Sequence, residues 1–203
     1  MRSVIDVSKV GVNRQTVILV GGGGASPCTF GLDHSKPFIE VAEHPFLEHL
    51  VRHSTRFRIT DVLQLAGHGG EVIRDAGHDR SPFGFGARAR VLIEPGPMGT
   101  GGASAFAVDA LDEIFLAANG DSLFEADLCA FLTRSRADGH SGHLLLREID
   151  ASARYGTVRP NAAGRVTAFD EKRDDTGCQS IDAVVHLLRA VDLQRVAPSP
   201  LFA

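Results

Sequence analysis

The chain has 203 residues, of which 43% are hydrophobic and 23% are charged, and its formal net charge is −4. This length and balance are typical of one soluble globular domain with a sizeable core. An acidic balance without a concentrated stripe of Lys and Arg argues against a nucleic-acid surface. No apolar run approaches the roughly 20 residues that span a bilayer, and the first residues lack the apolar core of a secretory signal. We therefore expect a cytoplasmic protein with no membrane partner.

The first informative stretch is the apolar run 17–20, which leads directly into Gly21, Gly22, Gly23 and Gly24. A continuous apolar run suits a central parallel strand that is covered on both faces. Glycine lets successive backbone N–H groups converge on an anion without a Cβ in the way. The loop is either a flexible turn or a phosphate cradle, and the motifs that follow at fixed distances favour the cradle.

Beyond this loop, apolar runs alternate with amphipathic stretches, which is the pattern of an α/β sheet. We expect strands at 59–65, 90–94, 114–118, 142–147 and 180–188, and helices from 45, at 71–76, at 104–111 and from 128. The segments 154–158 and 165–170 read as a hairpin whose turn residues tolerate positive φ. Residues 1–15 are polar and irregular, so we expect an N-terminal extension followed by one domain over 16–203.

Three further positions are candidates for chemistry. Lys36 stands before Pro37, which favours an extended backbone, and it is otherwise an ordinary surface lysine. A second glycine-rich loop, with Gly99, Gly101 and Gly102, separates an expected strand from an expected helix, where a backbone can approach a base or an anion. Asp121 follows the strand 114–118, where a carboxylate can hold Mg²⁺ against phosphates, although such a residue is more often a turn residue.

Taken together, these motifs resemble the sugar-1-phosphate nucleotidyltransferases, and most closely their mannose- or heptose-1-phosphate guanylyltransferase-like members. The resemblance covers about residues 16–195 and keeps the family's order of motifs. The matching stretches are Gly21–Gly24, Ser35–Pro37, Pro45–Glu48, Gly99–Ala103, Asn119–Ser122, Ser152–Gly156 and Phe169–Lys172.

This resemblance implies a Rossmann-like three-layer α/β/α fold with a mixed, mainly parallel sheet. It implies transfer of a nucleotidyl group from an NTP, with GTP favoured, to a mannose- or heptose-type sugar 1-phosphate, with release of pyrophosphate. By position in the family, the first glycine loop would cradle the nucleotide, and Gly99, Gly101 and Gly102 would border the base. Asp121 would bind Mg²⁺, and Lys36 would neutralise phosphate oxygens.

By the same resemblance, the sugar phosphate would be held by Gly156, Glu171, Lys172 and Asp182. Asp182 begins the stretch Asp-Ala-Val where the family usually has Asn-Ala-Gly. The resemblance leaves the oligomeric state open, a homo-oligomer included.

Two departures favour an alternative function. Ser26 stands where the family's G-x-G-[ST]-R loop has its arginine, and serine supplies neither the charge nor the fork of donors that would clamp the leaving pyrophosphate. The family's second metal-binding aspartate lies beyond the strand at 181–188, in a segment that we expect this sequence to lack. The alternative is a catalytically impaired protein that binds a nucleotide or nucleotide sugar. A dehydrogenase fits less well, because G-x-G-x-x-G cannot be laid on the first loop.

Overall fold

The computed structural model describes residues 15–20, 39–67, 70–79, 86–137, 140–150, 155–171 and 177–196. The predicted site residues Gly21, Gly22, Gly23, Gly24, Lys36 and Lys172 lie outside these ranges. Their roles, and that of Ser26, therefore rest on the sequence alone.

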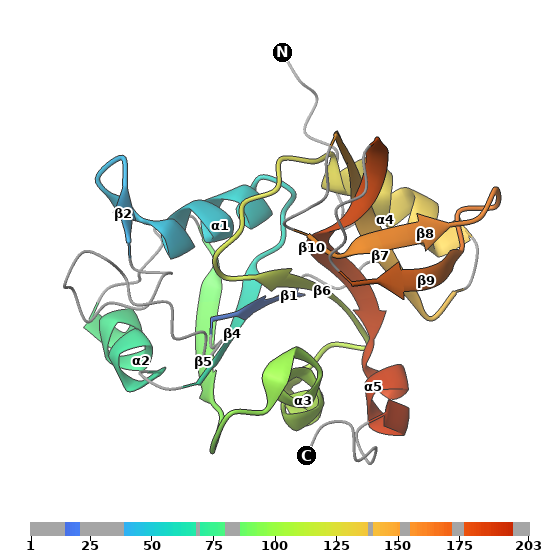
Figure 1. The fold of residues 1–203 in the computed structure, drawn as a ribbon. Coiled ribbons are helices and arrows are strands. Elements are labelled where there is room, and N and C mark those ends of the chain that lie inside the picture. The colour runs from blue at the N-terminus through green and yellow to red at the C-terminus, as the bar shows by residue number, and fades with distance from the viewer. Residues whose placement is uncertain are drawn as a thin grey trace.

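Four parallel strands form one half of the central sheet (Figure 1). In spatial order they are β5 (Arg88–Ile93), β4 (Asp61–Ala66), β1 (Gln15–Leu19) and β6 (Ile114–Asn119). In β1 the five residues are buried or nearly so, and β4 is buried from its second residue onward. Continuous apolar runs form such strands because helices cover both faces of a parallel sheet.

The other half of the sheet is antiparallel and is organised around the long strand β10 (Cys178–Arg189). This strand runs antiparallel to β6 and also pairs with β7 (Gly142–Asp150) and β8 (Thr157–Pro160). The hairpin partner of β8 is β9 (Val166–Asp170). A separate small sheet joins β2 (Glu40–Val41) to β3 (His44–Pro45). The sheet is mixed, as expected.

Helices cover both faces of the sheet and complete the expected three layers. One face packs against α1 (Phe46–Thr55), α2 (Gly70–Asp79) and α4 (Leu128–Ala137). The opposite face packs against α3 (Gly99–Phe106), the 3-10 turn at Val108–Ala110 and α5 (Ala190–Val196). Figure 1 shows α1 and α4 on one side of the sheet and α3 and α5 on the other.

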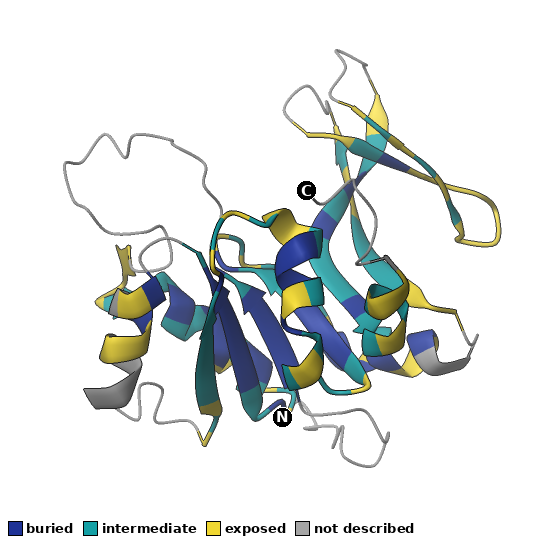
Figure 2. Ribbon diagram, turned by 90° about the horizontal axis from the view of Figure 1, so that it is seen from below, coloured by how far each residue is buried: buried dark blue, intermediate teal, exposed yellow. Residues whose placement is uncertain are grey.

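The alternation of side chains along the strands divides the core between these two faces. In β1, Ile18 packs in the cluster that includes α1, whereas Val17 packs in the cluster that includes α3. Successive side chains of a strand point to opposite faces, so one strand serves both layers. Figure 2 shows the buried residues concentrated in the strands and on the inner sides of the helices, while the β8–β9 hairpin projects away from this core.

One helix boundary differs from the expectation. The helix predicted at 104–111 begins at Gly99 and ends at Phe106, so the second glycine-rich loop is partly the first turn of α3. Glycine has a poor intrinsic helix propensity, and the sequence therefore predicted a loop. Packing overrides this preference, because Gly102 and Ala103 are buried against the sheet layer.

The predicted hairpin turn is confirmed. The Asn161 side-chain oxygen accepts hydrogen bonds from the backbone N–H groups of Ala163 and Arg165, both at 3.0 Å. Gly164 has φ +76°, the left-handed conformation that glycine adopts without strain. Among the described residues, none of the helices has the length and hydropathy needed to cross a membrane.

Candidate functional site

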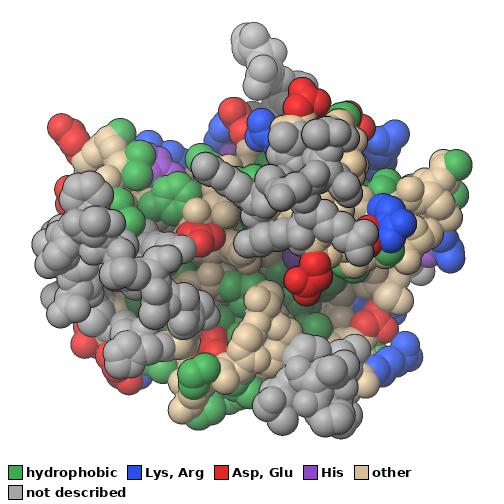
Figure 3. All heavy atoms as spheres, in the orientation of Figure 1, with side chains coloured by type: hydrophobic (Ala, Val, Ile, Leu, Met, Phe, Trp, Pro, Cys, Tyr) green, Lys and Arg blue, Asp and Glu red, His purple; other side chains and the backbone are tan. Residues whose placement is uncertain are grey.

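The carboxyl ends of the four parallel strands meet at one edge of the sheet. Val20, Glu94 and Gly120 each donate a backbone N–H to the carbonyl of a neighbouring strand at 2.8 Å. A Cβ on Gly120 would lie 2.7 Å from Val20 Cγ1, so only glycine allows the two chains to approach this closely. Ligands of open α/β sheets bind outside this edge. In Figure 3, acidic side chains border the hollowed middle of the face that is shown.

Glu94 is the most unusual carboxylate at this edge. It directly follows β5, it is only 7% exposed, and among the described residues its Oε1 accepts no hydrogen bond. Burial raises the pKa of Glu94, and a hydrogen bond from the Met98 backbone N–H opposes part of that rise. A buried carboxylate oxygen without a donor is costly unless a ligand supplies one. Sequence reasoning missed this residue, although an acidic residue directly after an apolar strand was the available signal.

The first turn of α3 lies next along the chain. Gly99 has φ +65°, and no side chain caps the helix start at Met98. Gly101 is half-buried, and a Cβ on Gly102 would lie 2.9 Å from Met98 Cβ. The unpaired N–H groups of a helix start favour an anion or a hydrogen-bond acceptor. Gly102 thus fits the tight turn itself, and the roles of Gly99, Gly101 and Gly102 at a base stay predictions.

Asp121 lies just beyond the end of β6, and its side chain is exposed. The Ser122 hydroxyl donates a hydrogen bond to Asp121 Oδ1 at 3.1 Å. Within the described ranges, His, Cys, Asp and Glu side chains do not gather in groups of three that could hold a metal ion. A single carboxylate suits Mg²⁺, which usually takes one or two protein carboxylates together with water and substrate phosphates.

The sheet forks beside Asp121. On one side of β10, residues Val185–Arg189 pair with β6, and Ile181 pairs with Thr157 of β8. The intervening residues 182–184 pair with no described strand on that side. Since β10 runs antiparallel to β6 and Val185 lies opposite Ala118, residues 182–184 lie past the last pair, toward the end of β6 that Asp121 follows. We call this region, bounded by the end of β6, residues 182–184 and the start of β8, the fork.

Three predicted sugar-phosphate residues line up at the fork. Ile181, Thr157 and Asp170 form one row across β10, β8 and β9. Counting one residue further along each strand gives Asp182, Gly156 and Glu171, of which Gly156 and Glu171 lie just outside β8 and β9. At about 4.8 Å between strands, Asp182 and Glu171 are roughly 10 Å apart across the glycine. A Cβ on Gly156 would lie 3.1 Å from the Asp170 carbonyl oxygen, so this position suits a glycine, and the roles of these three residues at a sugar phosphate stay predictions.

A hydrogen-bonded pair of side chains and a bend shape the β10 side of the fork. His186 Nε2 lies 3.0 Å from Asp182 Oδ1 and 2.8 Å from Oδ2, and the Val184 N–H donates to Oδ1 at 2.8 Å. The pairing of β10 with β7 shifts register between Asp182 and His186. Val184 has φ +54°, a conformation that costs a β-branched residue about 1–3 kcal/mol. Backbone strain of this kind concentrates at functional sites.

The amino ends of the same parallel strands carry a closed polar network. Asp61 accepts hydrogen bonds from Arg90 at 2.9 Å and from the Gln15 amide at 3.3 Å. Gln15 also donates to the Ala110 carbonyl at 3.0 Å, and its own carbonyl accepts the Asp112 N–H at 2.8 Å. Burial alone would raise the pKa of Asp61, but these partners, Arg90 above all, lower it overall.

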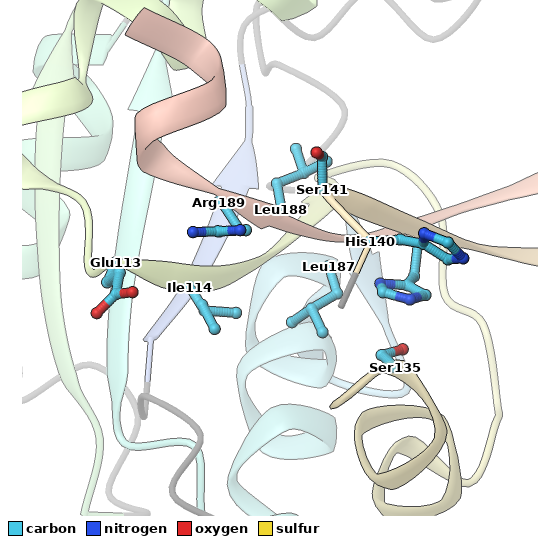
Figure 4. A pocket seen from close by; sticks show the side chains of 9 residues that line it. Glu113, Ile114, Ser135, His140, Ser141, Leu187, Leu188 and Arg189 are labelled. Carbon is cyan, nitrogen blue, oxygen red and sulfur yellow. The ribbon is translucent and has the colours of Figure 1, made fainter. Parts of the chain in front are cut away.

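A cavity of about 180 Å³ lies away from the predicted site, at the amino end of β6 (Figure 4). Its lining comes from the start of β6, the α4 residue Ser135, the beginning of β7 and the end of β10. His140 lies on one side of it in Figure 4, and Glu113 and Arg189 lie on the other; His143 also lines it. Of the predicted site residues that the structure describes, none lines this cavity, so it is separate from the carboxyl-end site.

Comparison with known proteins shows which proteins the chain is similar to. The chain is 27% identical over 194 residues to the mannose-1-phosphate guanyltransferase of Schizosaccharomyces pombe, covering 92% of this chain and 52% of that protein. It is 28% identical over 158 residues to the D-glycero-alpha-D-manno-heptose 1-phosphate guanylyltransferase of Campylobacter jejuni, covering 78% and 68%. The chain thus spans about half the length of the mannose-1-phosphate enzyme that it matches.

Solved structures agree with the fold. HddC from Yersinia pseudotuberculosis, determined in complex with GMP-PN, matches with a TM-score of 0.77 and 24% identity, over 92% of this chain and 80% of that chain. Residues 15–181 match the family described as Nucleotidyl transferase. That match spans most of the chain, including β1, the Asp121 turn and the row of Ile181, Thr157 and Asp170. The chain therefore belongs to the Nucleotidyl transferase family.

Proposed function

We propose that the chain joins an NTP to a sugar 1-phosphate, giving a nucleotide sugar and pyrophosphate, with GTP and a mannose- or heptose-type sugar as substrates. The observation that carries this proposal is the order of groups along the sheet edge. Glu94 and the α3 turn follow β5, Asp121 follows β6, and the row of Asp182, Gly156 and Glu171 follows on β10, β8 and β9. A base, a phosphate chain and a sugar can lie in that order.

Glu94 supports guanine as the base. Guanine presents two adjacent donors, the ring N1–H and the exocyclic amine, and a carboxylate can accept from both. Adenine has an acceptor where guanine has N1–H, so the same carboxylate would disfavour it. The Oε1 atom of this 7% exposed side chain, which has no donor among the described residues, is the oxygen that guanine would satisfy.

In the proposed reaction, a phosphate oxygen of the sugar 1-phosphate attacks the α-phosphorus of the NTP. The bond from that phosphorus to the bridging oxygen of the β-phosphate breaks, and pyrophosphate leaves with its electron pair. A divalent cation, which we propose is Mg²⁺ held by Asp121, would neutralise phosphate charge and align the reactants. Lys36 and Lys172 would add positive charge, and the Asp182 and Glu171 carboxylates would accept hydrogen bonds from sugar hydroxyls.

Release of pyrophosphate tests the proposal directly. Incubation with Mg²⁺, GTP and either mannose 1-phosphate or the heptose 1-phosphate should release pyrophosphate, and ATP should serve poorly. Omitting the sugar phosphate is the control for plain hydrolysis. Absence of pyrophosphate across four NTPs and a panel of sugar 1-phosphates would contradict the proposal.

The second candidate is a binding protein without turnover, which the replacement of the family arginine by Ser26 favours. Loss of one preorganised donor in such a site commonly costs on the order of 10²–10³ in rate. Calorimetry with GTP and GDP-sugars distinguishes the two functions, since tight binding without turnover supports the second. Activity gained by Ser26→Arg would show that the missing charge is the cause.

A further inference from the structure

Resting on the proposed function, the geometry points to a residue that no motif indicated: we propose that His186 is a positioning residue that holds the Asp182 carboxylate toward the hydroxyls of the bound sugar. It would set affinity for the sugar while leaving nucleotide binding unchanged. Three features support this role, which are the bend in β10, the hydrogen bonds of Asp182 and the opening of the fork.

The contact between His186 and Asp182 requires a bent strand. Residues four apart in a regular strand are roughly 13 Å apart, too far for their side chains to meet. In β10 the two side chains approach to 2.8 Å because Val184 adopts φ +54° and the register with β7 shifts between them. The bend therefore brings the imidazole to the carboxylate, and the Val184 N–H adds a second hydrogen bond from within the bend.

The hydrogen bonds orient Asp182 and leave part of its accepting capacity available. A carboxylate has about four lone-pair positions on its two oxygens. His186 Nε2 bridges both oxygens, and the Val184 N–H binds Oδ1. Donation by both groups reduces the repulsion that a bare carboxylate would exert on a nearby phosphate. The remaining lone pairs suit O–H donors, which a sugar supplies.

The position of the pair matches the place where a sugar would lie. His186 pairs in the sheet with Ala117 of β6 on one side and Leu144 of β7 on the other, and both are apolar. Its imidazole is hydrogen-bonded to Asp182. The side chains are 28% exposed for Asp182 and 25% exposed for His186, so both are partly accessible and a ligand can reach the carboxylate. The fork lies at residues 182–184 of β10, between the stretch that pairs with β6 and the residue that pairs with β8.

The test separates the sugar from the nucleotide. His186→Phe removes the donor and keeps a ring, His186→Gln keeps an N–H donor, and His143→Phe removes a histidine from the first residues of neighbouring β7 as the matched control. We expect His186→Phe to raise the KM for mannose 1-phosphate about tenfold, with the KM for GTP unchanged. His186→Gln should restore most of the affinity, and His143→Phe should have no effect.

Equilibrium binding gives the same comparison without turnover. Calorimetry with GDP and GDP-mannose measures the extra affinity that the sugar contributes, and His186→Phe should lose that margin while binding GDP as the wild type does. Asp182→Ala should lose the same margin, and the double variant should lose no more than either single one. Equal loss for GDP and GDP-mannose, or additive losses in the double variant, would overturn the positioning role.

A spectroscopic measurement on the unaltered protein covers the case in which His186→Phe does not fold. The Nε2 resonance of His186 should shift when saturating mannose 1-phosphate is added, and it should not shift in Asp182→Ala. No shift in the wild type would overturn the proposal. If the proposed function itself were wrong, the result would differ from these outcomes, because the wild type would release no pyrophosphate and bind neither GDP nor GDP-mannose.

Discussion

The two ends of the four parallel strands differ in how their polar groups are satisfied. At the amino ends, Asp61, Gln15 and Arg90 form a network in which the partners are protein groups. At the carboxyl ends, Glu94 keeps a buried oxygen without a partner among the described residues, and Asp121 is exposed. A group satisfied by the protein stabilises the fold, whereas a buried group that awaits a partner is available to a ligand. We therefore expect the network at the amino ends to serve stability and the carboxyl ends to serve binding.

The largest expected effect is at Asp121. Asp121→Asn keeps the shape of the side chain but removes the charge, so we expect kcat for nucleotidyl transfer to fall about 10³-fold. The side chain is exposed, so the free energy of unfolding should change little. Pyrophosphate release and chemical denaturation measure the two quantities. A variant with full activity would remove Asp121 from the proposed site.

The next effect concerns base selection by Glu94. Glu94→Gln replaces one acceptor oxygen by an amide donor, so kcat/KM for GTP should fall about 100-fold relative to ATP. Competition assays with the two nucleotides measure this ratio. An unchanged ratio would show that Glu94 does not contact the base.

The burial of Glu94 also predicts how the free energy of unfolding changes with pH. Burial raises the pKa of Glu94 above its ordinary value of 4.5, so the folded state holds the proton more tightly than the unfolded state does. The stability that Glu94 contributes is therefore fully present below pH 4.5 and is lost as pH rises through the raised pKa. Glu94→Gln should be more stable than the wild type at about pH 7 and should lose this advantage in acid. Urea denaturation at both pH values is the measurement, and the opposite sign would show that burial does not penalise the Glu94 carboxylate.

Asp61 tests the polar network at the amino ends of the parallel strands. Asp61→Ala removes the carboxylate that accepts from Arg90 and the Gln15 amide, which then keep only the Ala110 carbonyl, so the free energy of unfolding should fall by about 2 kcal/mol. Because the pKa of Asp61 is lowered, its contribution is present above the ordinary value of 3.8 and is lost as pH falls through the lowered pKa. The difference from the wild type should thus shrink in acid. A loss of kcat in folded Asp61→Ala would show that the two ends are not independent.

The smallest effect concerns the bend in β10. Val184→Gly removes the strain of a valine with left-handed φ. This gain offsets the loss of the side chain and the greater backbone entropy of glycine in the unfolded state, so the free energy of unfolding should change by less than about 1 kcal/mol. Val185→Gly, the matched control at the next position, relieves no such strain and should cost about 2 kcal/mol. Thermal or urea unfolding compares them. Equal costs would show that Val184 is not strained.

Much of the fold could be predicted, because it rests on local patterns. Continuous apolar runs predicted the buried strands β1 and β6, and the Asn161–Gly164 turn predicted the hairpin, since both signals lie within a few residues. The start of α3 was missed because its glycines favour a loop locally, and only burial of Gly102 and Ala103 against the sheet offsets that preference.

The site divides in the same way. Asp121, Gly156, Glu171 and Asp182 were named from motif order, and their register places the last three in one row. Glu94 and His186 were not named, because an unpartnered oxygen and a contact across a bend are properties of packing. A buried acid looks like any other acid in the sequence, and His186 lies four residues from Asp182 in what reads as a straight strand.

The sequence by itself determined the α/β alternation and the order of the family's motifs, because chain order and hydrophobic periodicity are local quantities. Only the tertiary structure decided where those motifs meet. Strand register brings residues 156, 171 and 182 side by side, and the backbone of Val184 closes the Asp182–His186 pair. Register and bends depend on contacts between residues that are distant in the chain, and such contacts form only when the sheet is assembled.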